Sequence, residues 1–456
     1  MTSQIYFAEQ ALLTQGWAKN VRIAVVDGVI QKITQDAQAS DAIFLTGPTV
    51  PTVANLHSHA FQRAMAGMAE ISLNAHDSFW SWRELMYKMV QKLSPDDVRI
   101  IATQLYIDML KAGYTQVAEF NYLHHQQNGQ AYGQLNEMAQ QLMQAANVAG
   151  LGLTLLPVLY SHSGFAGQAA NAGQARFINN TEQYLALHHA CEKQLAGHKL
   201  HQLGICFHSL RAVTQKQIQE VMAATSAQMP IHIHIAEQQK EVQDCLAWSG
   251  QRPVQWLANE IGLDKRWCLV HATHLSHDEL LSVARSQAVV GLCPSTEANL
   301  GDGIFPAADF MQAQGRWGIG SDSHVSLSLV EELRTLEYGQ RLRDQQRNRL
   351  YSQQQTHVGD FLFEQTRLGG NQASQVKLGL AVGHRADFMV LDHQHPFMAA
   401  SKREDILNRW LFACNENLIR HVYVAGNLVI TDFRHAQEEQ AGVEFTALLK
   451  RLFNAS

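Results

Sequence analysis

Eight short apolar runs alternate with helix-like stretches over the middle of the chain, and this alternation constrains the fold more than any other feature. Strands that alternate with helices form a parallel sheet, because each helix carries the chain back to the start of the next strand. Eight such units within about 320 residues predict an α/β protein built on a (β/α)8 TIM barrel with insertions. The expected strands span residues 53–57, 116–120, 151–159, 203–207, 231–235, 267–270, 288–292 and 317–320.

The two ends of the chain show a different pattern, that of short strands and turns. Residues 21–26 lead through Asp27-Gly28 into another apolar run, which is the pattern of a β-hairpin. Residues 387–391 and 422–430 also have the composition of strands, and neither terminal set is large enough to close a sheet alone. We therefore expect a small β-sandwich domain formed by residues 1–50 and 376–456, including a C-terminal helix, beside a barrel domain of residues 51–375.

Composition and charge limit the partners and the cell compartment that we expect for this chain. The 456 residues are 46% hydrophobic and 17% charged, as in an ordinary soluble globular protein. The net charge of −6 is spread along the chain without a basic stripe, which argues against a nucleic-acid partner. No apolar run is long enough to cross a membrane, and the N-terminus lacks the pattern of a signal peptide. Six scattered cysteines without a Cys-x-x-Cys motif then favour the cytoplasm.

Histidine is frequent where the predicted strands end. The carboxyl ends of barrel strands share one rim, and chemistry takes place at that rim. Polar residues follow strands in any protein, which accounts for a serine or an aspartate but poorly for histidine at five or more of eight ends. In chain order the ends carry His57 and His59, Glu119 and Tyr122, Tyr160 and His162, His208 and Arg211, His234 and Glu237, His271 and His274, Ser295 and Glu297, and Asp322 and His324.

A metal site is the simplest use of these residues. His57 and His59 stand two positions apart, so both imidazoles point the same way in an extended segment. With His234 and Asp322 they supply the nitrogen and oxygen ligands of a catalytic zinc site. We interpret His232 as a packed core histidine, and without the histidines Asp322 would read as a helix N-cap. The fourth strand ends without a lysine that could bridge a second metal, so one metal is expected.

Two further residues fit the chemistry that zinc makes available. Zinc lowers the pKa of a bound water toward about 7, so hydroxide is available at neutral pH. Glu237 is placed to move a proton from that water to a leaving nitrogen, although it also fits a solvated helix start. His271 is placed to stabilise charge as a tetrahedral intermediate forms, although a lone histidine is more often structural.

The set of motifs resembles the amidohydrolase superfamily, in its mononuclear deaminase branch. The resemblance covers essentially the whole chain, and its motifs are His57-x-His59, His234-x-x-Glu237, His271 and Gly320-Ser321-Asp322. Closer still, residues 55–67 and 295–303 look like the formimidoylglutamate deiminase family. Members of that family convert N-formimidoyl-L-glutamate and water to N-formyl-L-glutamate and ammonia in histidine degradation.

The resemblance implies a cofactor, an assembly and a set of site residues. It implies a homodimer with one zinc ion per subunit, although ligands of this kind also suit iron or nickel. It further implies that a metal-bound hydroxide attacks the formimidoyl carbon while Glu237 shuttles the proton and His271 assists. The implied residues are His57, His59, His234 and Asp322 for the metal, Glu237, His271 and Asp322 for catalysis, and Gln62, Arg83, Tyr122, His208 and Arg211 for the substrate.

The residues themselves also bear on the substrate. Arginine binds carboxylates through a planar fork, so Arg83 and Arg211 near the rim favour a small dicarboxylate, although either also fits a surface ion pair. The sequence leaves open which arginine meets which carboxylate, and it assigns no role to Glu297 or Asn299. A zinc deaminase of a purine or related heterocycle is the enzymatic alternative. A non-catalytic scaffold barrel is a remote one, because every expected ligand position is filled.

Overall fold

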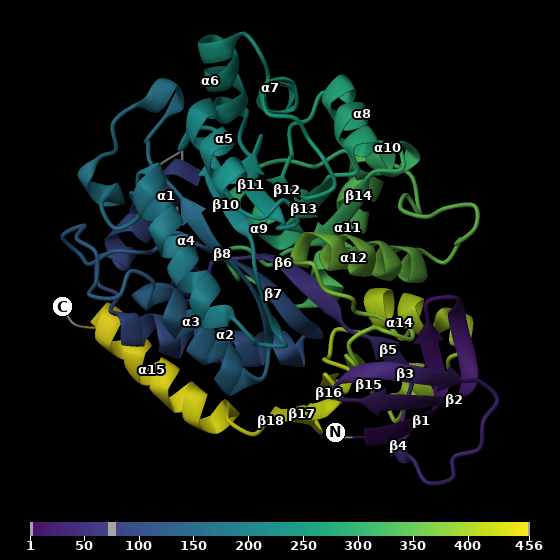
Figure 1. Ribbon diagram of the computed structural model, residues 1–456. Helices are drawn as coiled ribbons and strands as arrows, with labels where there is room; N and C mark the ends of the chain where they lie inside the picture. The colour runs from purple at the N-terminus through teal and green to yellow at the C-terminus, as the bar shows by residue number, and fades with distance from the viewer. Residues whose placement is uncertain (1–2, 72–78, 455–456) are drawn as a thin grey trace.

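The computed structural model describes residues 3–71 and 79–454, and Figure 1 shows a barrel beside a smaller sheet made from both chain ends. Eight parallel strands follow one another around the barrel in chain order, and the short β9 (His201–Leu203) pairs at the side of the third. The predicted (β/α)8 fold is therefore confirmed. The eight strands are β6 (Val53–Ser58), β7 (Tyr114–Asn121), β8 (Gly152–Leu159), β10 (Ile205–Ser209), β11 (Ile231–Ile235), β12 (Trp267–His271), β13 (Val289–Leu292) and β14 (Arg316–Ile319).

The barrel closes at the rim that carries the candidate ligands. Just beyond β14, the backbone N–H of Asp322 donates to the carbonyl of His57, with N and O 3.0 Å apart. The backbone N–H of His59 donates in return to the carbonyl of Asp322, at 3.2 Å. The first and last strands of the barrel are thus joined through residues predicted to bind metal, so closure of the sheet also sets the distance between them.

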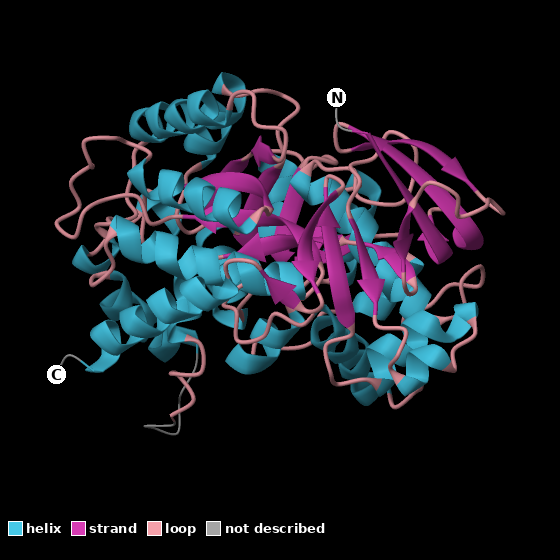
Figure 2. Cartoon of the chain, turned by 90° about the horizontal axis from the view of Figure 1, so that it is seen from below, coloured by secondary structure: helices cyan, strands magenta, loops and turns pink. Residues whose placement is uncertain are grey.

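Helices surround the barrel strands, as the view in Figure 2 shows. Some strands are followed by two or more helices, which are the insertions expected from the length of the chain. The helices are η1 (Ala60–Met65), α1 (Phe79–Val90), α2 (Pro95–Lys111), α3 (Glu137–Ala149), η2 (Phe165–Gly167), η3 (Ala172–Gln174), α4 (Thr181–Leu195), α5 (Gln215–Ala224), α6 (Gln239–Ser249), α7 (Pro253–Glu260), α8 (His277–Ser286), α9 (Pro294–Leu300), α10 (Ala307–Gln312), α11 (Leu329–Asp344) and α12 (Val358–Ser374).

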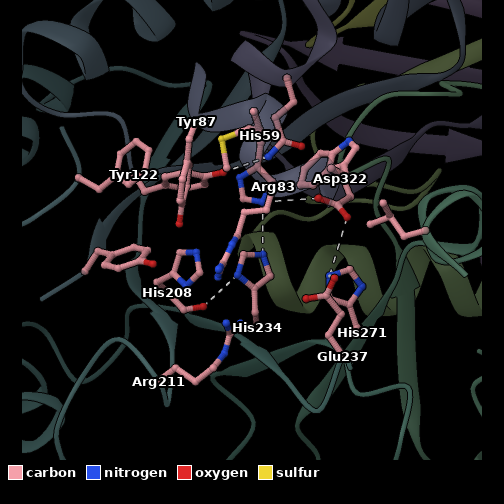
Figure 3. A pocket seen from close by; sticks show the side chains of 16 residues that line it. His59, Arg83, Tyr87, Tyr122, His208, Arg211, His234, Glu237, His271 and Asp322 are labelled. Atoms are coloured by element: carbon pink, nitrogen blue, oxygen red, sulfur yellow. Dashed lines mark hydrogen bonds and ion pairs between the residues drawn. The ribbon is translucent and has the colours of Figure 1, made fainter. Parts of the chain in front are cut away.

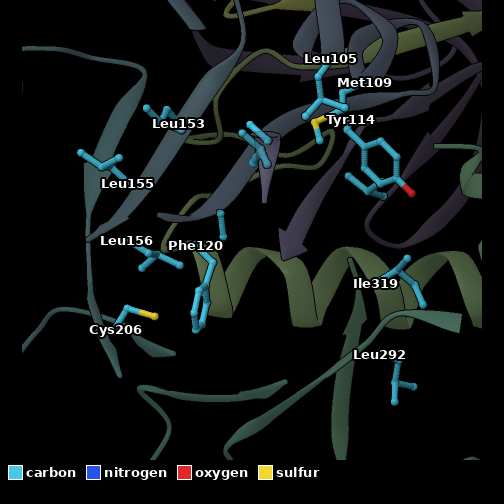
Figure 4. Packing of buried hydrophobic residues seen from close by; sticks show 14 of the residues in the cluster. Leu105, Met109, Tyr114, Phe120, Leu153, Leu155, Leu156, Cys206, Leu292 and Ile319 are labelled. Atoms are coloured by element: carbon cyan, nitrogen blue, oxygen red, sulfur yellow. The ribbon is translucent and has the colours of Figure 1, made fainter. Parts of the chain in front are cut away.

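Close packing of aliphatic and aromatic side chains fixes the strands against this layer. Every residue of β7 and β8 is buried, and β8 accordingly has a nearly continuous apolar sequence. β7 also buries polar residues, among them Gln116 and Glu119. Figure 4 shows Phe120 of β7 and Leu156 of β8 packed in the interior of the barrel. On the other side, α12 approaches so closely that a Cβ added at Gly369 would overlap the carbonyl oxygen of Trp317. Glycine is required there because only a bare backbone fits between helix and strand.

The ends of α2 and the last helix bind the two parts of the chain together. Ser94 caps α2, where its hydroxyl accepts the backbone N–H of Asp97. The C-terminal helix α15 (Glu438–Asn454) packs against α2 of the barrel, and an ion pair joins Arg451 to Asp97. The helix that the sequence groups with the terminal domain therefore lies on the barrel. None of the helices in the described part of the chain combines the length and apolar character needed to cross a bilayer.

The two chain ends share one nine-stranded mixed sheet within the described residues. The predicted hairpin around Asp27-Gly28 is present, with Val26 opposite Val29. Tyr6 packs edge-on against Phe388 and Tyr423, at ring separations of 5.1 and 5.4 Å, so the halves from the two ends enclose a common core. The elements are β1 (Ser3–Leu13), β2 (Gly16–Val26), β3 (Val29–Thr34), β4 (Ile43–Leu45), β5 (Thr49–Pro51), β15 (Phe388–Leu391), α13 (Pro396–Ala399), η4 (Arg403–Asp405), α14 (Ile406–Ala413), β16 (Ile419–Val424), β17 (Asn427–Thr431) and β18 (Arg434–His435).

Candidate metal and substrate site

The four predicted metal ligands converge at the rim. His57 lies at the end of β6, His59 just after it, His234 near the end of β11 and Asp322 beyond β14. The Nε2 atom of His234 lies 3.0 Å from that of His57 and 3.3 Å from that of His59. Asp322 Oδ1 lies 3.4 Å from His57 Nε2 and 3.5 Å from His59 Nε2.

The hydrogen bonds of His59 and His234 show which nitrogen of each ring carries the proton. Nδ1 of His59 lies 2.9 Å from the carbonyl oxygen of Phe120, and Nδ1 of His234 lies 2.9 Å from that of His208. A carbonyl only accepts, so in both neutral rings the proton sits on Nδ1 and a lone pair remains on Nε2. Two lone pairs that face each other at 3.3 Å repel, and a cation between them removes the repulsion.

The separations fit a metal of the size of zinc. Ligands at about 2.1 Å from a tetrahedral zinc ion stand about 3.4 Å apart, and the four ligand atoms here are 3.0–3.5 Å apart along the contacts just described. Burial lowers the pKa of His57, His59 and His234, so the imidazoles stay neutral as metal ligands must be. Although burial alone would raise the pKa of Asp322, the neighbouring imidazoles hold it below its usual range, and the carboxylate stays ionised.

Two further predicted residues stand beside the ligands. His271 Nε2 lies 3.9 Å from Glu237 Oε1 and 3.8 Å from Asp322 Oδ2. Burial raises the pKa of Glu237 well above its ordinary value, which suits a carboxyl group that both takes and gives a proton near neutrality. For His271 burial acts against protonation, but the carboxylates around it outweigh burial and raise its pKa.

A partly enclosed cavity opens onto these residues, lined by aromatic side chains and a few polar ones, as small-molecule sites are. Figure 3 shows Arg83, Arg211 and Tyr122 on its walls, opposite Glu237 and His271. All five residues predicted to contact the substrate line this cavity, namely Gln62, Arg83, Tyr122, His208 and Arg211. Sequence reasoning named Tyr160 as a strand-end residue without a role and missed the other walls, which are Trp82, Met86, Tyr87, Phe177 and Leu300.

The polar groups of the cavity are held by specific partners. Gln62 Nε2 donates to the hydroxyl of Tyr122 at 3.0 Å. Burial and the nearby charge of Arg211 lower the pKa of His208, which is therefore neutral at pH 7. For Arg211, burial alone would lower the pKa, but the buried carboxylates of Glu241 and Glu237, together with nearby tyrosines, outweigh it and keep the guanidinium charged. The cavity therefore presents cations on one side and the carboxyl group of Glu237 on the other.

Other strand-end residues lie behind the cavity rather than on it. His232 Nε2 donates to the carbonyl of Ala373 at 2.8 Å, which confirms its interpretation as a core histidine. His324 lies between Ser58 Oγ at 3.2 Å and Ser321 Oγ at 2.9 Å, and so links the segments that carry His57 and Asp322. His162 and His274 do not line the cavity.

The backbone between the first two histidines has its own support. Glu119 of β7 is buried, and its carboxylate accepts the hydroxyl of Ser58 at 2.6 Å and the backbone N–H of Ala60 at 2.7 Å. Ser58 lies between the two histidines and Ala60 follows them, so one carboxylate fixes the segment from both sides. The sequence had placed Glu119 at the end of the second strand without a role.

Two family descriptions and several known proteins match the chain. The amidohydrolase family matches residues 49–429, and the N-terminal domain of formimidoylglutamate deiminase HutF matches residues 3–42. The chain is 57% identical over 452 residues to a formimidoylglutamate deiminase from Pseudomonas aeruginosa, which covers 98% of this chain and 99% of that protein. It is also 25% identical to a 5-methylthioadenosine/S-adenosylhomocysteine deaminase from Natronomonas pharaonis, over 84% of this chain and 81% of that protein.

Solved structures share the fold. A crystal structure of an amidohydrolase from Brucella melitensis superposes with a TM-score of 0.94 at 46% identity, over 98% of this chain and 99% of that one. An adenosine deaminase from Xanthomonas campestris, solved with bound zinc, superposes with a TM-score of 0.82 at 19% identity, over 99% of each chain. At 19% identity, the second structure is evidence for the fold alone.

Proposed function

Since this chain belongs to the amidohydrolase family and, within it, to the formimidoylglutamate deiminases, we propose that it hydrolyses N-formimidoyl-L-glutamate to N-formyl-L-glutamate and ammonia in histidine degradation. The observation that carries the proposal is the placement of Arg83 and Arg211 in the same cavity as Glu237. Two guanidinium groups suit the two carboxylates of this substrate, and the amidine carbon then reaches the rim.

The ligands described above would hold one zinc ion, which when bound supplies the Lewis acidity that makes water a nucleophile at neutral pH. Glu237 accepts a proton as the water oxygen adds to the formimidoyl carbon. It delivers that proton to the terminal nitrogen, which becomes an amino group. A second transfer carries the remaining hydroxyl proton to the same nitrogen, the carbon–oxygen double bond forms as the carbon–nitrogen bond breaks, and ammonia leaves. His271 faces the same point from the side of Asp322 and stabilises the charge that develops during addition.

The cavity walls orient the substrate for this step. Arg211 stands near the end of β10, and Arg83 faces it from α1, where its guanidinium lies 5.6 Å from the ring of Tyr87. Gln62 and Tyr122 form a hydrogen-bonded pair beside the ligands, where they can contact the amidine group. Because both ends of the flexible glutamate chain are held, the reacting carbon stays in the orientation that the reaction needs.

The direct test is ammonia release from N-formimidoyl-L-glutamate by zinc-loaded protein. The matched control is N-formimidoyl-L-norvaline, in which a methyl group replaces the side-chain carboxylate, and we expect kcat/KM to fall by about 100-fold or more for this compound. Release of ammonia from adenosine or 5-methylthioadenosine, with none from the formimidoyl compound, would instead support the purine deaminase alternative.

The proposal extends to the setting of the enzyme. All six cysteines are free and buried, as suits a reducing cytoplasm. The pairing of two subunits that the family resemblance implies is tested by sedimentation of the purified protein at several concentrations.

A further inference from the structure

Glu297 is a buried carboxylate that the reaction outlined above does not use. It lies on α9, which follows β13, and its Oε1 is 3.3 Å from Nδ1 of His271. The same oxygen accepts the backbone N–H of Cys293 at 2.9 Å. The carboxylate is therefore held by its own helix while it faces the ring nitrogen of His271 that points away from the reacting groups.

The short helix that carries Glu297 is fixed at two further points. The backbone N–H of Ser295 donates to Glu332 of α11 at 2.9 Å. The hydroxyls of Thr296 and Ser323 lie 3.0 Å apart, and Ser323 follows the predicted ligand Asp322 directly. Three consecutive residues thus connect α11, the Asp322 segment and His271, which gives Glu297 a defined position relative to the rim.

The imidazole of His271 has to be held in one orientation, and its backbone conformation is itself uncommon. The residue ends β12 with a φ of +66°, a conformation that non-glycine residues seldom adopt and that concentrates at functional sites. Its Nε2 has to face Glu237 and Asp322, at 3.9 and 3.8 Å, and a ring with a single anchored nitrogen can rotate about the Cβ–Cγ bond. An acceptor at Nδ1 fixes both the rotation and the nitrogen that keeps its proton.

We propose that Glu297 is a positioning residue that holds the ring of His271, so that Nε2 faces the reacting carbon. The inference rests on the proposed deiminase reaction for its kinetic consequence, and it deepens that reaction by assigning a role to the segment after β13. A purely structural reading is that Glu297 only satisfies the backbone of Cys293 and stabilises α9. The two readings differ in what happens when His271 is changed as well.

The kinetic test is the Glu297→Gln variant, which keeps an oxygen acceptor of the same length and removes the charge. For the zinc-loaded variant we expect kcat to fall by about 10- to 100-fold with little change in KM and in zinc content. Glu332→Gln is the matched control on the same network. Burial raises the pKa of Glu332 to about 8, so an amide replaces a mostly protonated carboxyl there, and we expect kcat to stay within about twofold.

A double-mutant cycle separates the two readings. If Glu297 acts through His271, Glu297→Gln will cost nothing more in a protein that already carries His271→Asn. An equal loss of kcat in both backgrounds, an unchanged kcat in the single variant, or an equal loss in Glu332→Gln would each overturn the proposal.

A measurement independent of activity keeps the inference testable if the proposed reaction fails. In the zinc-loaded protein with 15N-labelled histidine, the Nδ1 proton of His271 should give a downfield signal that His271→Asn removes. We expect this signal to move upfield in Glu297→Gln and to remain in place in Glu332→Gln, since a charged acceptor makes the stronger hydrogen bond. Absence of the signal from the parent protein, or its persistence unshifted in Glu297→Gln, would refute the contact whatever the substrate is.

Discussion

The cavity has two halves that are built in different ways. The metal half contains the predicted ligands with Glu237, His271 and Arg211, and the α1 half contains Arg83 and Tyr87. Backbone pairing between β6 and the segment after β14 fixes His57 and Asp322, and both residues are almost fully buried. Arg83 and Tyr87 on α1 are partly exposed and stand on a helix that is not part of the sheet. In the proposed function, the barrel supplies the reacting groups and Arg211, whereas a helix outside the sheet supplies the second arginine, Arg83.

The largest effect belongs to the metal half. Glu237→Gln preserves size and burial but removes the group that carries the proton, so we expect kcat to fall by about 10²- to 10⁴-fold. The ligands are untouched, and elemental analysis should find the same zinc content as in the parent protein. A Gln variant that retains a tenth of the parent rate would show that Glu237 is not the proton carrier.

The two histidines of β11 provide a second test of the metal half. His234 and His232 point to the same side of the strand, but only His234 reaches the ligand cluster, while His232 donates to Ala373. We expect His234→Asn to weaken zinc binding by more than about 100-fold, since loss of a direct ligand exceeds the 10- to 100-fold cost of losing its support. His232→Asn should keep the zinc and lower only the melting temperature, and loss of zinc from both variants would contradict the assignment.

The same contrast explains what the sequence could reveal. His57, His59, His234 and Asp322 were predictable because parallel strands bring their carboxyl ends to one rim, and a two-residue spacing keeps two side chains on one side. The hairpin at Asp27-Gly28 was predictable for a similar reason, since its turn is local. In each case the position follows from a regular element and its period.

Residues outside that regularity were harder to place. Tyr87 and Phe177 meet at a ring separation of 5.8 Å, yet one comes from α1 and the other from the segment that follows η3. No periodicity relates the two, so only tertiary packing brings them to the cavity. Glu297 was visible at a strand end but had no role, because its partner His271 lies on a different strand.

Arg211 in the metal half and Arg83 in the α1 half allow the two halves to be compared directly. Arg211→Met and Arg83→Met should each raise KM for N-formimidoyl-L-glutamate by about 30-fold or more, the loss expected when one carboxylate of the substrate is left without its cation. Only Arg211→Met should also lower the melting temperature, because it leaves the buried carboxylate of Glu241 without the charge beside it. Equal melting temperatures for the two variants would show that loss of an arginine destabilises both halves of the cavity to the same extent.

The smallest effect is expected from the residue that connects α1 to the rest of the molecule. Arg176 is fully buried and donates to three carbonyl oxygens, at Val90 where α1 ends, and at Leu93 and His125 at 2.9 Å each. A longer contact of 3.4 Å joins it to the hydroxyl of Tyr132. In Arg176→Met these buried carbonyls lose their donor, at a cost of about 1–3 kcal/mol each in the free energy of unfolding. Because α1 carries Arg83 and not the metal ligands, we expect KM to rise by about 3- to 10-fold at constant zinc content and nearly constant kcat.

Arg99→Met, on the partly exposed face of α2, serves as the matched control and should change neither constant. A fall in kcat without a change in KM would mean that α1 supports the reacting groups themselves, and the division between the two halves would have to be abandoned.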